Sequence, residues 1–282
     1  FALVGLKVSG PDIEDTLNSY MEQANAADLF VVAGYGLSGE DQAEIKQENA
    51  DVEFGYFADT VIADTPNAIR VFSQTTDIST FELVSGEFPT KSNEVALAQT
   101  MADQYKIGDT IRLNESGSST LLKEHEFTIT GFVNSSELLS KTIKGVSSAG
   151  SGDLSGFAVV PKDTFDSEVY TIARLRYPDL RKWKTTSREY ADKVAQLQQA
   201  LEEKLADNGA ARLDALKTTA DDKISEGKEK IADAKTQLSD AEKKLTDGKS
   251  EIEKNEKTLA DGQEEVRSNE ATIASGDEKL NA

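Results

Sequence analysis

The sequence predicts an α+β globular domain followed by a long helical coiled-coil stalk. All five prolines lie at or before Pro178, and every aromatic residue except Tyr190 lies at or before Trp183. Short apolar segments in this first part are typical of strands, whereas the last part carries a seven-residue repeat that is typical of a coiled coil. We therefore predict two bodies, a globular domain at residues 1–186 and a stalk at residues 187–282.

The amino-terminal residues 1–8 (FALVGLKV) are apolar, but they are too few to cross a membrane and lack the features of a signal peptide. Two interpretations stay open for them: the outer end of a membrane-spanning helix, or a first strand. A helix is predicted to begin at Pro11, because Ile13, Leu17 and Met21 follow it at helical spacing.

The rest of the first part reads as strands joined by turns. Residues 29–33 form a predicted strand, followed by a glycine-rich turn and a helix that begins after Ser38, where Asp41 completes a capping box. Further strands are predicted at residues 52–63, 68–72, 94–98, 110–113, 126–133, 157–160 and 169–176. Few helices separate these strands, which favours an α+β domain over an alternating α/β fold.

The second part begins with a helix from Ser187. Its apolar face holds Tyr190, Val194, Leu197, Leu201 and Leu205. Asn208 and Gly209 predict a stop or a kink after this helix, and the heptads begin at about residue 224.

The heptads carry one row of large aliphatic residues and, three positions later, one row of small or polar residues. The large row is Ile224, Ile231, Leu238, Leu245, Ile252, Leu259, Val266, Ile273 and Leu280. The small row is Gly227, Ala234, Ala241, Gly248, Asn255, Gly262, Asn269 and Gly276. Glycine costs a helix about 1 kcal/mol relative to alanine, but a row without side chains lets a second helix approach closely.

We therefore predict that the two rows form a seam for a partner helix, about 84 Å long at about 1.5 Å per residue. The alternative is a fraying helix or a low-complexity acidic tail, which the unbroken spacing disfavours. Because the repeat runs to the last residues, we expect the chain to be a piece of a longer protein, with the returning helix of the coil beyond residue 282.

The composition restricts the partners and the chemistry. The chain has 51 acidic and 31 basic side chains and a formal net charge of −20, which disfavours nucleic acid because phosphate binding requires a basic surface. Without cysteine, disulfides and thiolate metal sites are excluded.

Motifs for catalysis or for a cofactor fail on spacing. His125 is the single histidine, and no nucleophile elbow occurs. The glycines of segment 150–156 are spaced wrongly for a dinucleotide loop, and segment 247–250 (DGKS) lacks the first glycine of a phosphate loop because residue 243 is Lys243. No calcium loop is present either. We therefore predict no catalytic, cofactor-binding or metal-ligating residue, and a chain that is not itself an enzyme.

Residues 82–113 (ELVSGEFPTKSNEVALAQTMADQYKIGDTIRL) and 125–133 (HEFTITGFV) resemble the extracytoplasmic domain of MacB-like and FtsX-like ABC transporter permeases. The family pattern is a G-x-x-P turn, an N-E-(V/I)-x-L strand, a short helix, a G-D-x-(I/V) turn and a strand that ends near (I/V)-x-G. The matching residues here are Gly86, Pro89, Asn93, Glu94, Gly108, Asp109 and Gly131. Residues 140–177 resemble the end of this domain in a Gram-positive subgroup whose permeases insert a coiled coil.

The resemblance implies a porter-like subdomain, residues 28–63 and 157–177, with an inserted, mostly β subdomain at about residues 64–156. It also implies a place on the extracellular side of the cell membrane, as a fragment of an integral membrane protein, and ATP hydrolysis in a separate nucleotide-binding subunit. The implied partners are the returning helix of the same permease, the ATP-binding subunit through the membrane part, a second permease copy and a cell-wall protein such as a hydrolase.

Three functions stay open. The favoured hypothesis is mechanotransmission: the stalk passes an ATP-driven conformational change to the cell surface or wall. The second is export of an amphipathic peptide, lipid or antibiotic. The third, from another class, is a passive surface protein that binds partners through its coiled coil.

Overall fold

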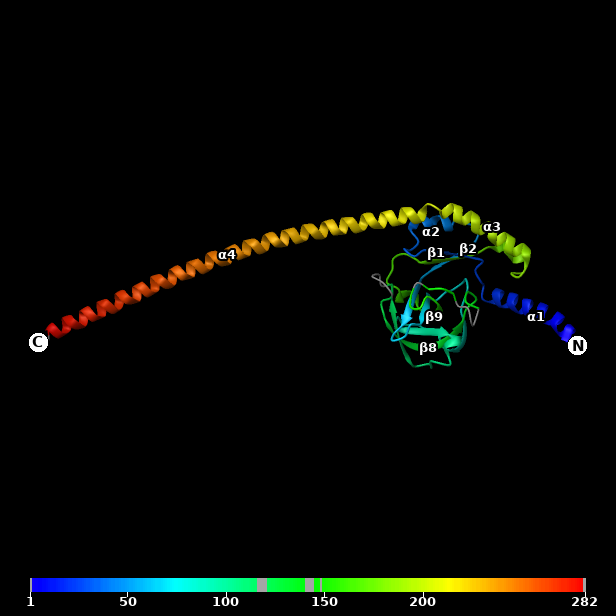
Figure 1. Cartoon of the computed structure of the whole chain (residues 1–282), viewed down its shortest axis with the longest axis horizontal. Coiled ribbons are helices and arrows are strands. Elements are labelled where there is room, and N and C mark those ends of the chain that lie inside the picture. Colours follow the sequence, from blue (N-terminus) through cyan, green and yellow to red (C-terminus); the bar gives the residue numbers. More distant parts are fainter. Residues whose placement is uncertain (1, 116–120, 140–144, 148, 281–282) are drawn as a thin grey trace. The chain divides into compact units, whose positions relative to one another are not determined.

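The computed structural model describes residues 2–115, 121–139, 145–147 and 149–280, and within these ranges it describes the side chains of residues 13–275. The chain divides into two compact units, Phe1–Leu213 and Asp214–Ala282. Unit 1 contains both sheets, and unit 2 consists of the greater part of α4 (Asn208–Leu280) (Figure 1). The predicted α+β class with a helical stalk is confirmed.

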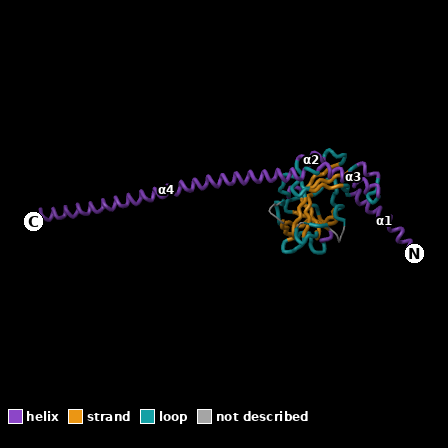
Figure 2. The backbone as a smooth tube through the Cα atoms, turned by 45° about the horizontal axis from the view of Figure 1, so that its top comes forward, coloured by secondary structure: helices purple, strands orange, loops and turns teal. Residues whose placement is uncertain are grey.

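Unit 1 contains a small antiparallel sheet that is covered by helices. Its strands, in spatial order, are β1 (Leu29–Val32), β10 (Ile172–Arg176) and β2 (Asp51–Gly55). The helices of unit 1 are α1 (Ala2–Gln23), α2 (Gly39–Ile45) and α3 (Arg188–Leu205). Ile45 of α2 and Leu201 of α3 are buried against Leu29 and Leu175 of the sheet, so α2 and α3 share one core with it (Figure 2).

A larger, mixed sheet is inserted between β2 and β10. Its strands are β3 (Phe57–Ile62), β4 (Ala68–Ser73), β5 (Glu82–Gly86), β6 (Glu94–Ala98), β7 (Thr110–Glu115), β8 (Glu126–Asn134) and β9 (Leu154–Val160). The spatial order is β5-β8-β6-β9-β4-β3-β7, and β7 also pairs with β8, so the sheet closes on itself. The described part of unit 1 also contains three short 3-10 helices: η1 (Gln99–Met101), η2 (Lys162–Thr164) and η3 (Pro178–Lys182).

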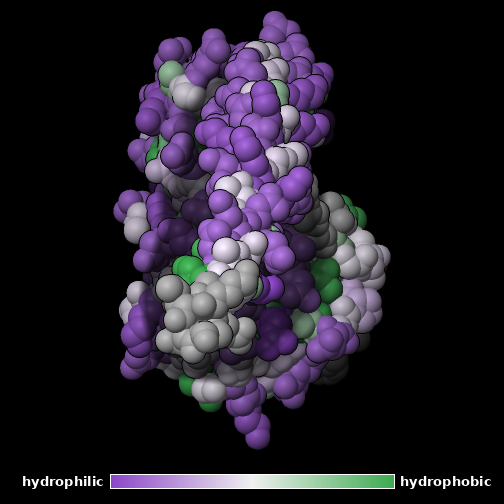
Figure 3. Space-filling view, turned by 90° about the vertical axis from the view of Figure 1, so that its left-hand side faces the viewer, coloured by the Kyte–Doolittle hydropathy of each residue, from purple (hydrophilic) through white to green (hydrophobic). Residues whose placement is uncertain are grey.

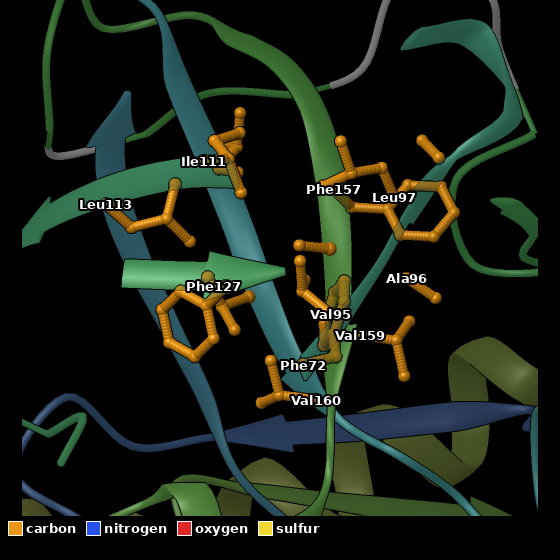
Figure 4. Close-up of a cluster of buried hydrophobic side chains, with 14 of the residues drawn as sticks. Phe72, Val95, Ala96, Leu97, Ile111, Leu113, Phe127, Phe157, Val159 and Val160 are labelled. Atoms are coloured by element: carbon orange, nitrogen blue, oxygen red, sulfur yellow. The ribbon is translucent and has the colours of Figure 1, made fainter. Parts of the chain in front are cut away.

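Closure of the larger sheet creates the main hydrophobic core. Side chains from β4, β6, β7, β8 and β9 gather in one cluster, including Phe72, Val95, Phe127 and Val159 (Figure 4). Phe127 and Val159 are fully buried. The closed sheet therefore leaves few free edges and encloses its apolar face.

The chain passes from the small sheet to the larger one at Gly55 and Tyr56. A Cβ on Gly55 would lie 2.9 Å from Ser73 Oγ and 3.1 Å from Arg174 Nη1, so a larger residue there would displace these side chains. Tyr56 N donates to the same Ser73 Oγ (2.9 Å), and Phe57 N donates to Thr171 Oγ1 (2.7 Å). The predicted strand at residues 52–63 is therefore two strands, β2 and β3, that belong to different sheets.

The inserted part is wider than the predicted range of about 64–156. β3 pairs with β4, and β9 pairs with β4 in parallel, so both β3 and β9 belong to the larger sheet. The family resemblance implies instead that residues 57–63 and 157–160 belong to the porter-like subdomain. The strand pairing, which joins residues far apart in sequence, places both segments in the larger sheet.

Two further sequence interpretations differ from the structure. The alternative of a first strand at residues 1–8 is wrong, because α1 begins at Ala2 and continues through Pro11 to Gln23. Alanine and leucine in this segment have high helix propensity. Strand β5 was not predicted, since all five of its residues are exposed and its segment lacks an apolar alternation. Among the described residues, no helix is long and apolar enough to cross a membrane.

Helix α3 belongs to the globular unit, whereas the predicted stalk begins at residue 187 and includes it. Leu201 is buried in the core of the small sheet, and Tyr190, Val194 and Leu197 pack against that core. The stalk of the structure therefore consists of α4. The predicted break at Asn208 and Gly209 is observed as the boundary between α3, which ends at Leu205, and α4, which begins at Asn208.

A buried ion pair joins the two sheets. The Arg174 side chain on β10 is fully buried, and its Nε donates to Glu137 Oε1 (2.5 Å), while Nη2 donates to Glu137 Oε2 (3.2 Å). Glu137 follows β8 of the larger sheet, and its side chain is 8% exposed. The bidentate geometry is the strongest that arginine and a carboxylate form.

Glu53 of β2 makes a second connection, to the segment that follows β4. Its carboxylate accepts hydrogen bonds from the backbone N–H groups of Thr76 (2.8 Å), Asp77 (2.9 Å) and Ile78 (2.7 Å). Burial raises the pKa of Glu53, but the three N–H donors and Lys162 outweigh burial, so its pKa lies below the ordinary value. The ionised form is therefore the one that the fold stabilises.

We predict that Arg174→Met destabilises the globular unit by about 3–5 kcal/mol, because it leaves the Glu137 charge buried without a partner. Arg174→Met combined with Glu137→Leu should recover most of this loss. Arg112→Met is the matched control: its ion pair with Glu126 is 61% exposed on both sides, and its removal should cost about 0–1 kcal/mol. Urea unfolding of the four chains measures these differences, and equal losses for Arg174→Met and Arg112→Met would contradict the role of the buried pair.

We also predict that Glu53 makes stability depend on pH in the acid range. Because its folded-state pKa is lowered from 4.5, its contribution is complete above that value and is lost as the pH falls through the folded-state pKa. Glu53→Gln should lower the free energy of unfolding at pH 7 by about 1–3 kcal/mol. The difference between wild type and variant should shrink as the pH falls below about 4.5. Thermal unfolding at a series of pH values measures this, and a difference that is constant with pH would contradict it.

Candidate helix-binding surface

The large row of the seam lies uncovered on α4. Its members from Ile224 to Ile273 expose between 54% and 64% of their surface. The spacing of seven residues places successive members two helical turns apart, with a drift of about 20° per heptad that a partner follows by supercoiling. Hydrophilic residues dominate the face of the molecule in Figure 3. The row of exposed aliphatic residues on α4 is therefore the candidate surface for a partner helix.

The small row leaves open space beside these residues. A Cβ placed on Gly227, Gly248 or Gly262 would meet no atom within 4 Å. A shallow depression at Gly262 is lined by Leu259 and Val266, together with polar residues on either side. Ala234, Ala241, Asn255 and Asn269 are also exposed. Gly276 and Leu280, the last two predicted members of the seam, lie in α4 but outside the residues whose side chains are described.

The stabilising contacts along α4 are local. Lys230 pairs with Glu226 one turn earlier (2.5 Å), and threonines such as Thr236 and Thr258 donate to the carbonyl four residues before them. Exposed pairs of this kind contribute only about 0.2–1 kcal/mol each. Each glycine in the helix opposes them by about 1 kcal/mol. A helix with this composition gains most of its stability from a partner that covers its apolar row.

The base of α4 is held to the globular unit by polar contacts with α2. Asn208 Nδ2 donates to Asp41 Oδ1 (2.8 Å) and Glu44 Oε2 (2.7 Å). Lys204 Nζ at the end of α3 pairs with Glu48 Oε1 (2.8 Å). Asp41 is also the N3 residue of the predicted capping box, which is confirmed: Asp41 N donates to Ser38 Oγ, and Ser38 N donates to Asp41 Oδ2. The capping box therefore positions a carboxylate that binds the first residue of the stalk.

Asp28 anchors α3, which leads into the stalk. Its side chain is fully buried and accepts hydrogen bonds from Tyr177 N (2.7 Å), Tyr190 Oη (2.6 Å) and the guanidinium of Arg181. Burial raises the pKa of Tyr190, and its hydrogen bond to the negative Asp28 raises that pKa further, so the phenol stays protonated as a donor. One carboxylate thus joins the start of β1, the end of β10 and α3.

Helix α1 is connected to the residues directly before α3. Asn18 Oδ1 accepts from Thr185 N (2.9 Å) and Thr185 Oγ1 (2.6 Å), and Asn18 Nδ2 donates to Thr186 Oγ1 (3.2 Å). Lys184 Nζ pairs with Asp15 Oδ1 (2.6 Å). Asn18 is 9% exposed, so these hydrogen bonds are shielded from water. Sequence reasoning missed this connection, because an asparagine on an amphipathic helix carries no signal for a partner far along the chain.

The residues that carry the family resemblance gather around β8. Gly86 has a positive φ of 78°, and a Cβ on it would lie 2.2 Å from Thr130 O. A Cβ on Gly131 would lie 2.6 Å from Glu87 O. Gly108, with a φ of 94°, donates its N–H to Ile129 O (2.8 Å). Close backbone contacts therefore require glycine at 86 and 131, whereas at Gly108, where a Cβ would meet nothing within 4 Å, the positive φ favours glycine.

The polar residues of the same motifs stabilise the turns that lead to β6 and β7. Asp109 Oδ2 accepts from Lys106 N (2.9 Å), and Glu94 accepts from the backbone N–H groups of Thr90 (2.9 Å) and Lys91 (3.1 Å). Asn93 O accepts from Thr128 N of β8 (2.9 Å). Pro89 lies in the turn between β5 and β6. The motif residues are thus distant in sequence but adjacent in the fold, and their contacts are structural.

The residues considered for chemistry are not brought together. His125 is exposed at the start of β8, and its carbonyl accepts from Leu113 N (2.8 Å). Gly150 and Gly152 lie in a turn with positive φ values of 57° and 91°. Among the described residues, no group of three or more His, Cys, Asp or Glu is placed to hold a metal ion.

We predict that a leucine-to-alanine substitution destabilises the protein strongly on α3 and very little on α4. Leu201→Ala removes a buried side chain and should destabilise the globular unit by about 2–5 kcal/mol. Leu238→Ala removes an exposed one, and in dilute solution its effect should stay within about 0.5 kcal/mol. Circular dichroism during urea unfolding of the full chain measures both; a large loss for Leu238→Ala at the lowest concentration would mean that the seam is already covered within one chain.

No protein-family model matches the chain, and no curated protein matches it. Among solved structures, the chain is similar to the extracellular domain of the noncanonic ABC-type transporter YknZ from Gram-positive bacteria. The TM-score is 0.33 and the sequence identity 11%, over 59% of this chain and 87% of that domain. A similarity this low establishes neither the family nor the function of this chain.

Proposed function

We propose that this chain is the extracellular domain of an ABC transporter permease, and that its stalk transmits an ATP-driven conformational change to a partner outside the membrane. The single observation that carries this proposal is the connection of α1, through Asn18, to the residues that lead into α3 and α4. On the family resemblance, α1 follows a membrane-spanning helix. A movement of that helix then reaches the base of the stalk directly.

The path from α1 to α4 contains few flexible joints. Asn18 binds Thr185 and Thr186, which immediately precede α3. α3 is fixed to the small sheet by Leu201 and by the hydrogen bond from Tyr190 to Asp28. Helices transmit displacement along their axes with little loss, because each turn is held by backbone hydrogen bonds. A displaced α1 therefore acts on α3 and the first residues of α4.

The closed larger sheet serves as a rigid support in this proposal. Arg174 and Glu53 tie it to the small sheet at two separate places, through Glu137 and through the backbone of residues 76–78. The motif residues Gly86, Gly108 and Gly131 hold its strands around β8. Backbone contacts or a positive φ favour glycine at these three positions. Their match to the family pattern therefore supports a similar architecture, and the proposed assignment to an ABC permease rests on that similarity.

The proposed function implies specific partners. ATP hydrolysis takes place in a separate nucleotide-binding subunit, which acts on this domain through the membrane part of the permease. The seam of α4 binds another helix, and the stalk acts on a cell-wall protein such as a hydrolase. The domain lies on the extracellular side of the cell membrane.

Export of an amphipathic substrate is the second candidate, and one groove favours it. A cavity of about 590 Å³ lies between β1 and α3, lined by apolar residues such as Val31, Val194 and Leu205. This volume falls within the range of about 300–1,000 Å³ that small-molecule sites occupy. A saturable, stoichiometric quenching of a label near Val194 by an amphipathic peptide would favour export.

We predict that ATP binding changes the distance between α1 and the stalk in the parent permease assembled with its ATP-binding subunit. Spin labels at Ile13→Cys, which is 66% exposed, and Ser250→Cys report this distance by pulsed electron resonance. Asn18→Ala should reduce the change by half or more, because it removes the link to Thr185. Asn114→Ala, an exposed asparagine on β7, is the matched control and should leave the change intact. An unchanged distance during ATP hydrolysis, or equal behaviour of the two variants, would overturn the proposal.

A further inference from the structure

The residues that flank the seam of α4 divide by charge into two halves. The flanking positions are the residue before each large residue and the residue after each small one. In the first half these are Lys223, Lys228, Lys230, Lys235, Gln237, Glu242, Lys244 and Lys249. In the second half they are Glu251, Glu256, Thr258, Gln263, Glu265, Glu270, Thr272, Asp277 and Lys279. The flanking residues from Lys223 to Thr272 are exposed. Lysine dominates the first flank, whereas acidic residues dominate the second, whose one basic residue is Lys279 at its end.

We propose that α4 of one copy binds α4 of a second copy in antiparallel orientation, centred between Gly248 and Ile252. This inference rests on the proposed use of the stalk as a helix-binding surface. Antiparallel pairing places the lysine-rich flank of each copy beside the mainly acidic flank of the other. Parallel pairing in register places lysine beside lysine and glutamate beside glutamate, and flanking charges are what sets the orientation of coiled coils.

The two rows of the seam favour the same orientation. In a parallel pair, layers of two large residues alternate with layers of two small ones, which leaves voids at each glycine. In the antiparallel pair, every layer combines one large and one small residue. The layers on one side of the centre are Ile224 with Gly276, Ile231 with Asn269, Leu238 with Gly262, Leu245 with Asn255 and Ile252 with Gly248; on the other side, Leu259 meets Ala241, Val266 meets Ala234 and Ile273 meets Gly227.

This arrangement gives the glycines of α4 a role. Because each layer combines one large aliphatic residue with glycine, alanine or asparagine, no layer holds two large residues, and the two helices can approach closely along the rod. The open space beside Gly248 and Gly262 accommodates Ile252 and Leu238 of the second copy. The self-complementary pattern points to a second copy as the occupant of the seam, and another helix of the same protein is the competing occupant.

Disulfide trapping in the full chain tests the orientation, and the absence of cysteine makes single-cysteine variants straightforward. Leu238→Cys and Gly262→Cys belong to one antiparallel layer, where their Cα atoms come within the reach of about 7 Å that a disulfide requires. Mixed under mild oxidation, the two variants should form a heterodimer at least five times more efficiently than either variant forms a homodimer. Ser239→Cys, on the outer face, is the matched control. Efficient homodimers of Leu238→Cys would show parallel pairing and overturn the proposal.

Sedimentation equilibrium tests the charge argument. Glu256→Lys, Glu265→Lys and Glu270→Lys together should raise the dimer dissociation constant at least tenfold at low salt. Glu253→Lys, Asp261→Lys and Glu264→Lys change the net charge equally on the outer face and should raise it less than threefold. Equal effects of the two triple variants, or a chain that stays monomeric at all concentrations, would overturn the antiparallel pair. If the chain stays monomeric while ATP still changes the distance between α1 and the stalk, the self-pairing is wrong and the proposed function stands.

Discussion

The buried carboxylate of Asp28 is the interaction on which the architecture of the globular unit depends. It stands directly before β1, and it binds the backbone of Tyr177 after β10, the guanidinium of Arg181 and the phenol of Tyr190 on α3. A carboxylate can be buried only if its charge is compensated by donors on several sides. The need to satisfy this one charge fixes α3 against the small sheet, and α3 in turn fixes where α4 begins.

The two sheets depend on each other through charges as well. Arg174 and Glu53 both project from the small sheet, and their partners lie in segments that follow strands of the larger one. Both groups are charged and nearly inaccessible to water. Removing the partner of such a buried charge destabilises the fold by more than an ion pair exposed to water contributes. The remaining charge has lost the interaction that compensates for its desolvation. The inserted sheet is consequently held in a defined place while its own core stays independent.

α3 and α4 show how similar periodicity can serve two purposes. Both helices carry large aliphatic residues at helical spacing, yet Leu201 is buried and Leu238 is 61% exposed. The apolar face of α3 is covered by Leu29 and Leu175, whereas the row on α4 is uncovered. A stalk with an uncovered apolar row and an anchored base suits a protein that acts on other helices.

The sequence by itself determined what depends on neighbours along the chain: the capping box of Ser38 and Asp41, most strand positions, the break at Asn208 and the two rows of the seam. Local propensity and periodicity are sufficient for these. The tertiary structure decided what depends on distant partners. The separation of β2 from β3, the burial of α3, the link from Asn18 to Thr185 and the pairing of Arg174 with Glu137 all join residues that are far apart in sequence. Such contacts are set by strand pairing and by compensation of buried charge, and neither leaves a periodic signal in the chain.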